Sequence, residues 1–195
     1  MKLLHIDSSA LGANSVSRGL SAAIVAEWKA HHPGLQVEYR DLDAEPLPHL
    51  TGAALAKSDP AQAAEAERVL EQFLSADVVV IGVPMYNLSI PSTLKAWIDR
   101  IVVAGRTFRY TAEGPQGLAG GRKVIIASAR GGLHAGAPTD FQEPYLRQLF
   151  AFIGIHDVEL VRAEGVAISP EHREQALAGA RARIDELVQP LAEAA

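Results

Sequence analysis

The chain has 195 residues, of which 48% are hydrophobic and 21% charged, a composition typical of one folded domain rather than of a disordered segment. Its 18 basic and 23 acidic residues give a net charge of −5 and form no basic cluster, which argues against nucleic acid as a partner. It contains no cysteine. Disulfides, thiolate nucleophiles and cysteine-ligated metals are therefore excluded, and any redox chemistry requires a cofactor.

Neither a secretion signal nor a membrane span is predicted. Asp7 interrupts the first apolar residues too early for the apolar region of a signal peptide. The longest strongly apolar stretch, residues 78–83, is far shorter than the ~20 residues that a membrane-spanning helix needs. We therefore expect a cytoplasmic protein with no membrane partner.

The first quarter of the chain predicts a strand, a helix and a second strand. Residues 3–6 are a short buried strand that stops at a polar cluster. Apolar side chains then recur every four residues, which predicts a helix that ends before Pro33. The recurring positions are Val16, Leu20, Ile24 and Trp28. The alternating residues 37–42 predict the second strand.

The middle of the chain predicts the central strand of a parallel sheet. A loop with a short helix is expected before the surface helix 60–74. The β-branched run 78–83 is typical of a strand that helices cover on both faces. Pro91 is expected at the first position of the next helix, which continues through Ile101. Residues 107–121 are rich in glycine and are expected to lie outside the main sheet.

The last third predicts strand 124–128, helix 145–153, strand 158–163 and a closing helix 170–191. No repeat or linker interrupts this βαβαβαβαβα order, so a single domain is expected over residues 1–195. Strands that alternate with helices form a parallel sheet with right-handed crossovers. Five such units suit an α/β, flavodoxin-like, doubly wound five-stranded parallel sheet of order 2-1-3-4-5, with helices on both faces.

In this arrangement ligands bind outside the carboxyl ends of strands 1 and 3, where the strand order reverses. Three loops lie there: residues 8–17, 84–90 and 128–138. The three loops are therefore the expected binding region.

The first loop precedes a helix and carries hydroxyl groups at Ser9, Ser15 and Ser17. Hydroxyls and free backbone N–H groups at a helix N-terminus favour an anion. The loop has neither GxGxxG nor a P-loop lysine, which favours a monophosphate such as that of FMN. A simple helix N-cap explains Ser15 equally well, so this loop alone leaves both interpretations open.

The second and third loops offer complementary surfaces for a planar ring. Residues 85–88 supply apolar side chains and an amide, although core packing and turn formation are the alternatives. The switch-point rule favours the ligand. In the third loop, Gly131 and Gly132 let the backbone approach a flat ligand closely. An ordinary turn, with His134 as an exposed loop histidine, explains this loop as well.

A series of motifs runs in order through nearly the whole chain. The motifs are Ser9, Ser15-Val16-Ser17, Pro84-Met85-Tyr86-Asn87, Phe108-Arg109-Tyr110-Thr111, Gly114-Pro115, Arg130-Gly131-Gly132, Pro138-Thr139-Asp140 and Phe152-Ile153-Gly154. Together they resemble the FMN-dependent azoreductases, which are NADH:quinone oxidoreductases of the flavodoxin-like superfamily. The series is far more specific than any one motif.

The resemblance implies a set of FMN contacts and a dimeric assembly. Ser9, Ser15, Val16 and Ser17 would hold the FMN phosphate. Met85, Tyr86, Asn87 and Leu88 would line the isoalloxazine ring, and Ala129, Arg130, Gly131 and Gly132 would wrap its pyrimidine side. The family is homodimeric, with a substrate pocket that the partner subunit completes. Phe108, Tyr110 and Phe152 are its expected aromatic walls; for Phe108, core or interface packing is an equal alternative.

Two positions depart from the family pattern. Leu88 stands where many members have Phe, and Ala129 stands where many have Ser. Neither change removes a group that flavin chemistry needs. Both positions adjoin the expected ring, so acceptor preference and flavin potential are the properties they affect.

The expected chemistry is that of the flavin, because no Ser-His-Asp set, carboxylate pair or metal-ligand spacing stands out. In the expected ping-pong cycle, NADH or NADPH reduces FMN and leaves before a quinone or azo compound binds. Asn87 and His134 are candidates to hydrogen-bond the acceptor. The alternatives are a flavodoxin-type electron carrier that docks to protein partners and a non-catalytic flavin or nucleotide sensor. A carrier would be more acidic and would lack the aromatic segment 108–110.

Overall fold

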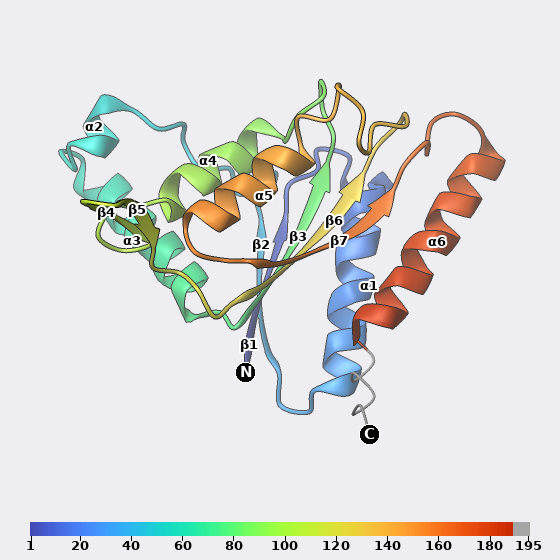
Figure 1. Ribbon diagram of the computed structural model, residues 1–195, viewed down its shortest axis with the longest axis horizontal. Coiled ribbons are helices and arrows are strands. Elements are labelled where there is room, and N and C mark those ends of the chain that lie inside the picture. Colours follow the sequence, from blue (N-terminus) through green and yellow to red (C-terminus); the bar gives the residue numbers. More distant parts are fainter. Residues whose placement is uncertain (189–195) are drawn as a thin grey trace.

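The computed structural model describes residues 1–188 and contains one parallel sheet of five strands in the order β2-β1-β3-β6-β7 (Figure 1). The strands are β1 (Lys2–Asp7), β2 (Gln36–Asp41), β3 (Val78–Pro84), β6 (Lys123–Ala129) and β7 (Asp157–Ala163). Within this sheet β6 and β7 are the fourth and fifth strands along the chain. The predicted flavodoxin-like order 2-1-3-4-5 is therefore confirmed.

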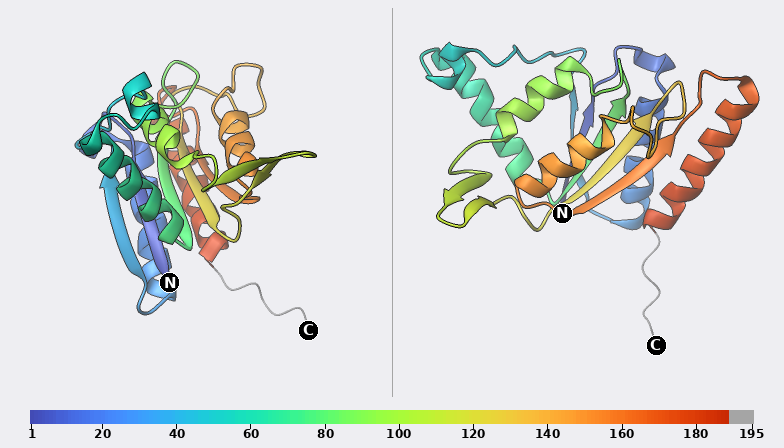
Figure 2. Two further views of the ribbon diagram at one scale, coloured as in Figure 1. Left: turned by 90° about the vertical axis from the view of Figure 1, so that its left-hand side faces the viewer. Right: turned by 45° about the horizontal axis from the view of Figure 1, so that its top comes forward.

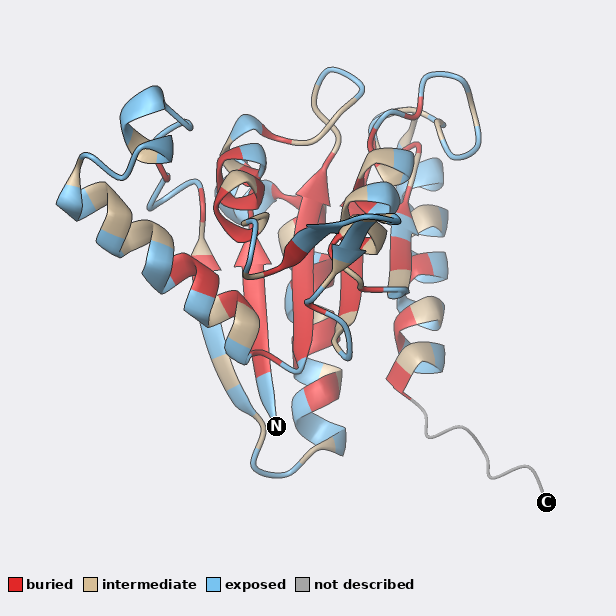
Figure 3. Cartoon of the chain, turned by 60° about the vertical axis from the view of Figure 1, so that its left-hand side comes forward, coloured by how far each residue is buried: buried red, intermediate tan, exposed pale blue. Residues whose placement is uncertain are grey.

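Helices cover both faces of the sheet (Figure 1). One face packs against α1 (Val16–His31) and α6 (Pro170–Val188), and the other against α3 (Pro60–Ser75), α4 (Ser92–Ile101) and α5 (Glu143–Phe152). Successive strand side chains point to opposite faces, so Leu3 joins the cluster with α1 whereas Leu4 joins the cluster with α3. The central strands are accordingly buried along their length (Figure 3). No helix within residues 1–188 is long and apolar enough to cross a membrane.

Two helices begin at positions other than those predicted. Pro91 is the N-cap of α4 rather than its first helical residue, so that prediction is wrong by one position. Helix α5 begins at Glu143 rather than at 145, because Asp140 Oδ1 accepts the N–H groups of Gln142 and Glu143 at 3.1 and 3.0 Å. The expected short helix is α2 (Gly52–Leu55). Positions 189–191 of the expected closing helix lie outside the described residues.

Residues 107–121 lie outside the main sheet, as predicted, and residues 108–117 of this segment form a hairpin. Strand β4 (Phe108–Thr111) pairs antiparallel with β5 (Gly114–Gly117), and the hairpin projects from the body of the molecule (Figure 2). Its backbone contacts the end of α5 closely: a Cβ added to Gly117 would lie 2.1 Å from the nitrogen of Gly154. Two glycines thus allow the hairpin to lie directly against the turn that follows α5, and the Ala119 N–H donates to the Ile153 carbonyl oxygen there at 2.8 Å.

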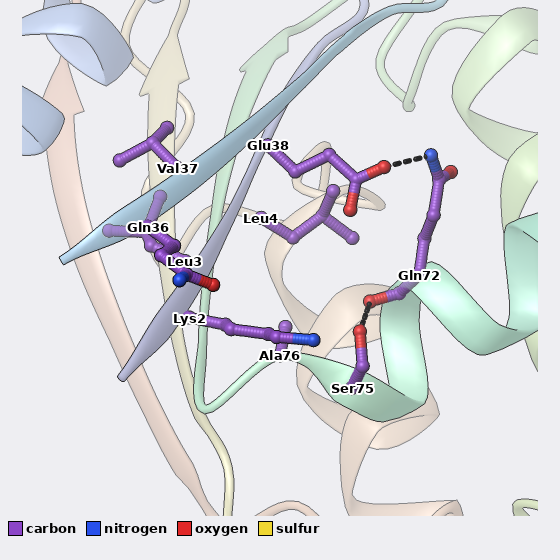
Figure 4. A pocket seen from close by; sticks show the side chains of 9 residues that line it. All are labelled: Lys2, Leu3, Leu4, Gln36, Val37, Glu38, Gln72, Ser75 and Ala76. Atoms are coloured by element: carbon purple, nitrogen blue, oxygen red, sulfur yellow. Dashed lines mark hydrogen bonds between the residues drawn. The ribbon is translucent and has the colours of Figure 1, made fainter.

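A small hollow of about 180 Å³ lies at the amino edge of the sheet, where β1, β2 and the end of α3 meet (Figure 4). The Gln72 amide donates to the Glu38 carboxylate across it, and Ser75 Oγ donates to the Gln72 carbonyl oxygen at 3.2 Å. The Gln72–Glu38 bond connects α3 to the edge strand β2, whereas the Ser75–Gln72 bond lies within α3. The hollow lies at the opposite edge from the three predicted binding loops.

Gly82 in β3 is expected to tolerate no side chain. An added Cβ would lie 2.4 Å from Asp7 Oδ1 and 3.2 Å from the Ser17 carbonyl oxygen. Gly82→Ala must therefore displace the buried Asp7 carboxylate, which accepts a hydrogen bond from Ser21 Oγ at 2.7 Å. We expect this change to lower the free energy of unfolding by about 2 kcal/mol in urea titrations.

Gly179→Ala in α6 is the matched control, because its added Cβ meets no atom within 4 Å. The control is expected to be neutral or to stabilise by up to ~1 kcal/mol. Equal free energies of unfolding for Gly82→Ala and the wild-type protein would show that the close packing at Gly82 does not constrain the fold.

Candidate functional site

The loops that follow β1, β3 and β6 lie next to one another at the carboxyl edge of the sheet (Figures 1 and 2). Direct hydrogen bonds connect them. Ser8 Oγ donates to the Gly82 carbonyl oxygen at 2.8 Å, and the Met85 N–H donates to the Ala129 carbonyl oxygen at 2.9 Å. The structure thus brings together the three loops that the sequence predicts.

The first loop enters α1 through a short 3-10 turn, η1 (Gly12–Asn14). Ser15 is the N-cap of α1: its Oγ accepts the Arg18 N–H at 3.3 Å and lies 3.1 Å from Ser17 Oγ. The N–H groups of Val16 and Ser17 have no acceptor within residues 1–188. The N-cap interpretation of Ser15 is therefore confirmed. The cap stands beside two free donors at the positive end of a helix, and anion binding by this loop stays a prediction.

Tyr86 connects the first loop to the second. Its hydroxyl lies 3.1 Å from Ser9 Oγ and accepts the Ala10 N–H at 3.2 Å. Ser9 is fully buried, and its Oγ also accepts the Leu11 N–H at 3.3 Å. The Tyr86 side chain is consequently committed to protein contacts.

The second loop is a tight two-residue turn. The main chains of Tyr86 and Ser89 exchange two hydrogen bonds of 2.9 and 3.0 Å. Asn87 and Leu88 between them both have positive φ angles, 48° and 68°, as a type I′ turn requires. Asparagine tolerates this conformation, whereas a leucine is strained by about 1 kcal/mol. The turn leaves both side chains exposed.

The side chain of Arg130 belongs to an internal ion network rather than to the open edge. Its guanidinium is fully buried; Nη1 lies 2.8 Å from Asp140 Oδ2 and 3.2 Å from Glu164 Oε1. Its Nε donates to Ser128 Oγ at 3.1 Å. The side chain of Arg130 is thus engaged within the protein, and its N–H also donates to the Ala163 carbonyl oxygen at 2.9 Å. Contact of residue 130 with a ligand stays a prediction.

Gln142 extends this network to the second loop, and the sequence analysis missed it. Its Oε1 accepts from Ser128 Oγ at 2.7 Å, and its Nε2 donates to the Pro84 carbonyl oxygen at 2.9 Å. Gln142 is buried and Glu164 is partly buried, which distinguishes both from ordinary exposed loop residues. No sequence signal points to either.

The Gly131-Gly132 pair presents its backbone at the edge. The N–H groups of both glycines donate no hydrogen bond in the part of the chain that the structure describes. The His134 ring lies over Gly132, where an added Cβ would be 3.0 Å from Nε2, and its Nδ1 lies 3.0 Å from Thr139 Oγ1. The loop thus offers two donors beside a positioned imidazole.

A second arginine, Arg18, also lies at this edge, and unlike Arg130 it was not singled out by the sequence analysis. Nη1 and Nη2 donate to the two carboxylate oxygens of Asp41 at 2.5 and 2.7 Å. Nε and Nη2 donate to the Ser9 carbonyl oxygen at 3.1 and 2.8 Å. The hydrogen bond to Asp41 raises the pKa of Arg18 further above its usual value, and the same contact lowers the pKa of Asp41.

The predicted aromatic walls form a cluster away from the loops of their own chain. The Phe108 ring lies 4.6 Å from that of Phe152 and 5.4 Å from that of Tyr110, between centroids. Helix α5 begins beside the third loop at Glu143 and rises roughly 15 Å before it ends at Phe152. Within one chain, the three rings therefore lie at the opposite end of α5 from the three loops.

Comparison with known proteins agrees with this geometry. A family model described as a flavodoxin-like fold matches residues 1–188. The FMN-dependent NADH:quinone oxidoreductase 1 of Xanthomonas axonopodis pv. citri (strain 306) is 67% identical over 186 residues, which cover 95% of this chain and 96% of that protein. The chain belongs to the FMN-dependent NADH:quinone oxidoreductase family.

This member of the quinone oxidoreductase family also resembles solved structures of azoreductases. An azoreductase from Bacillus anthracis str. Sterne has a TM-score of 0.89 and 31% identity, with 96% of this chain and 98% of that chain covered. An FMN-dependent NADH-azoreductase from Bacillus anthracis str. Ames Ancestor, in complex with FMN, has a TM-score of 0.85 and 26% identity, with 97% and 100% covered. The family predicted from the motifs is confirmed.

In this member of the quinone oxidoreductase family, the Arg130–Asp140 pair predicts pH-dependent stability. Burial acts to raise the pKa of Asp140, but the N–H groups of Glu143 and Gln142 and the Arg130 guanidinium outweigh it and hold the pKa below its usual value. Such a carboxyl stabilises the fold above its unfolded-state pKa and loses that contribution as the pH falls through its folded-state pKa. Asp140→Asn is expected to lower the free energy of unfolding by roughly 3 kcal/mol at neutral pH.

The stability lost through Asp140→Asn should become smaller as the pH falls below ~4, as measured by urea unfolding at a series of pH values. Asp157→Asn is the control, because Asp157 forms an exposed pair with Lys123 at 2.9 Å; its removal is expected to lower stability by less than about 1 kcal/mol. If Asp140→Asn lowered the free energy of unfolding equally at every pH, the ionised Asp140 carboxylate would not be the stabilising group.

Proposed function

We propose that this chain is a cytoplasmic, FMN-dependent NAD(P)H:quinone oxidoreductase and azoreductase, a single flavin-binding domain over residues 1–195. The observation that carries the proposal is the meeting of three loops at the carboxyl edge, each with unused polar groups. The names of the relatives and the FMN-bound azoreductase of similar fold support the same cofactor.

The residues present fit the two ends of FMN. A phosphate monoester suits the free N–H groups of Val16 and Ser17, together with the hydroxyls of Ser9, Ser15 and Ser17. The isoalloxazine ring carries polar atoms along its pyrimidine edge, which suit the N–H groups of Gly131 and Gly132. Met85 and the exposed Leu88 supply apolar surface for the ring.

The protein's part in the reaction is to bind, orient and exclude water. Bound FMN supplies the hydride chemistry, in a ping-pong cycle whose donor is NADH or NADPH and whose acceptors are quinones and azo compounds. Asn87 and His134 lie on the second and third loops and are proposed to hydrogen-bond the acceptor. Of the two residues that depart from the family pattern, Leu88 is exposed and Ala129 is buried. Because an exposed side chain can contact the acceptor, Leu88 is the one proposed to set acceptor preference directly.

We further propose a homodimer in which each active site takes aromatic residues from the partner. Phe108, Tyr110 and Phe152 lie far from the loops of their own chain, and 77% of Tyr110 is exposed on the projecting hairpin (Figure 2). These rings can wall a flavin pocket only if they belong to a second copy. The separation along α5 thus supports a shared site.

The flavin cycle is tested by the visible spectrum of the purified protein. We expect a bound-flavin spectrum that bleaches when NADH is added anaerobically, and sustained turnover when menadione is then supplied. A parallel titration with NADPH reports the preferred donor. Bleaching without turnover would favour an electron carrier, and unchanged absorbance would refute the cycle.

The shared site is tested by hybrid dimers. Tyr110→Ser is expected to lower menadione turnover roughly tenfold, through loss of aromatic packing on the acceptor, while leaving flavin content unchanged. Co-expression of Tyr110→Ser with a Gly132→Val chain, whose side chain blocks the flavin edge, should restore activity, because one site of each hybrid is intact. Light scattering gives the assembly state. A monomer, or hybrids no more active than their parents, would contradict the shared site.

A further inference from the structure

Arg18 stands where an arginine is unexpected. It lies in the first turn of α1, where the helix dipole favours anions and disfavours cations, and that turn contains no acidic residue. Its side chain is only 15% exposed. A buried charge at this place needs partners, and those partners show its role.

We propose that Arg18 is a positioning residue for the phosphate of FMN: it holds the loop of residues 9–15 in its binding shape, and Asp41 orients its guanidinium. The inference rests on the proposed function, because it concerns the phosphate end of that cofactor.

Arg18 contacts both ends of this loop. Its Nε and Nη2 donate to the Ser9 carbonyl oxygen at 3.1 and 2.8 Å, and its own N–H donates to Ser15 Oγ at 3.3 Å. Ser9 and Ser15 are two of the predicted phosphate-binding residues. The side chain and backbone of Arg18 therefore hold together the Ser9 backbone and the Ser15 hydroxyl, which flank the exposed segment 10–14.

The Arg18 guanidinium orients neighbouring protein groups and offers no unpaired positive charge to a ligand. All three of its nitrogens are engaged: Nε with Ser9, Nη2 with both Ser9 and Asp41, and Nη1 with Asp41 and, at 3.3 Å, the Tyr39 hydroxyl. The Asp41 carboxylate balances its charge in a bidentate pair. A direct ion pair between Arg18 and the phosphate would require these contacts to break.

The surroundings keep the pair in place. Asp41 Oδ1 also accepts the N–H groups of Asp43 and Ala44 at 3.0 and 3.3 Å. The Tyr39 hydroxyl donates to Asp7 Oδ2 at 3.1 Å. Burial, together with the Asp7 charge, raises the pKa of Tyr39 to about 12, so this hydroxyl stays protonated near neutral pH. Lysine cannot reproduce the arrangement, because one ammonium group lacks the planar fork that reaches Ser9 and Asp41 together.

The test compares FMN with riboflavin, which has the same ring and no phosphate. The full-length protein is loaded with either flavin and diluted, and the recovery of free-flavin fluorescence gives each dissociation constant. Arg18→Lys and Arg18→Gln are both expected to raise the constant for FMN by about tenfold and the constant for riboflavin by less than about twofold. Asp41→Asn should raise the dissociation constant for FMN by roughly threefold. This variant provides the test if an Arg18 variant does not fold.

Arg183→Lys is the matched control, since Arg183 in α6 pairs with Glu159 at 2.7 Å and with Glu186 at 2.9 Å, away from the loop. The control should leave both constants unchanged. Wild-type affinity for FMN in Arg18→Lys would overturn the inference in favour of charge alone, and equal weakening of both flavins would overturn it in favour of general packing. Failure of the wild-type protein to bind either flavin would instead refute the proposed function.

Discussion

Parallel hydrogen bonding between β1, β3 and β6 is the constraint on which the site depends. Because the strands run in one direction, their carboxyl ends at Asp7, Gly82 to Pro84, and Ala129 come to the same edge. Every residue of β3 is buried, because this strand lies at the centre of the sheet with helices on both faces. An antiparallel partner would carry its loop to the opposite edge. The serine loop, the tight turn and the glycine pair would then be separated by the length of the sheet.

Polar networks, more than apolar packing, fix the loops at that edge. Two arginines perform related tasks: Arg18 holds the Ser9 carbonyl while Asp41 balances its charge, and Arg130 lies among Asp140, Glu164 and Ser128. Buried charges are tolerated only when such partners are present. Because the network occupies side chains, the groups left unused in these loops are mainly backbone N–H groups. Fixed backbone donors suit a ligand that carries a phosphate at one end and a polar ring edge at the other.

Periodicity was sufficient to predict the sheet order and the three loops, because the β-branched run 78–83 and the recurring apolar positions of α1 are local patterns. The positions of single side chains depend on neighbours distant in sequence. Arg130 looks like part of a glycine-rich ligand loop until its contacts with Asp140 and Glu164 are known. Leu88 gives no local sign that it adopts a left-handed conformation. The aromatic cluster is displaced from the loops by the length of α5, which no motif records.

Hydrogen–deuterium exchange on the full-length protein, with and without FMN, tests the central claim most directly. A flavin across the carboxyl edge should slow amide exchange in residues 8–18, 84–90 and 130–135. Exchange in residues 50–70 and 99–104, which line a separate hollow of about 590 Å³ between α2, α3 and α4, should not change. Slowed exchange in that hollow, with none in the three loops, would contradict the account.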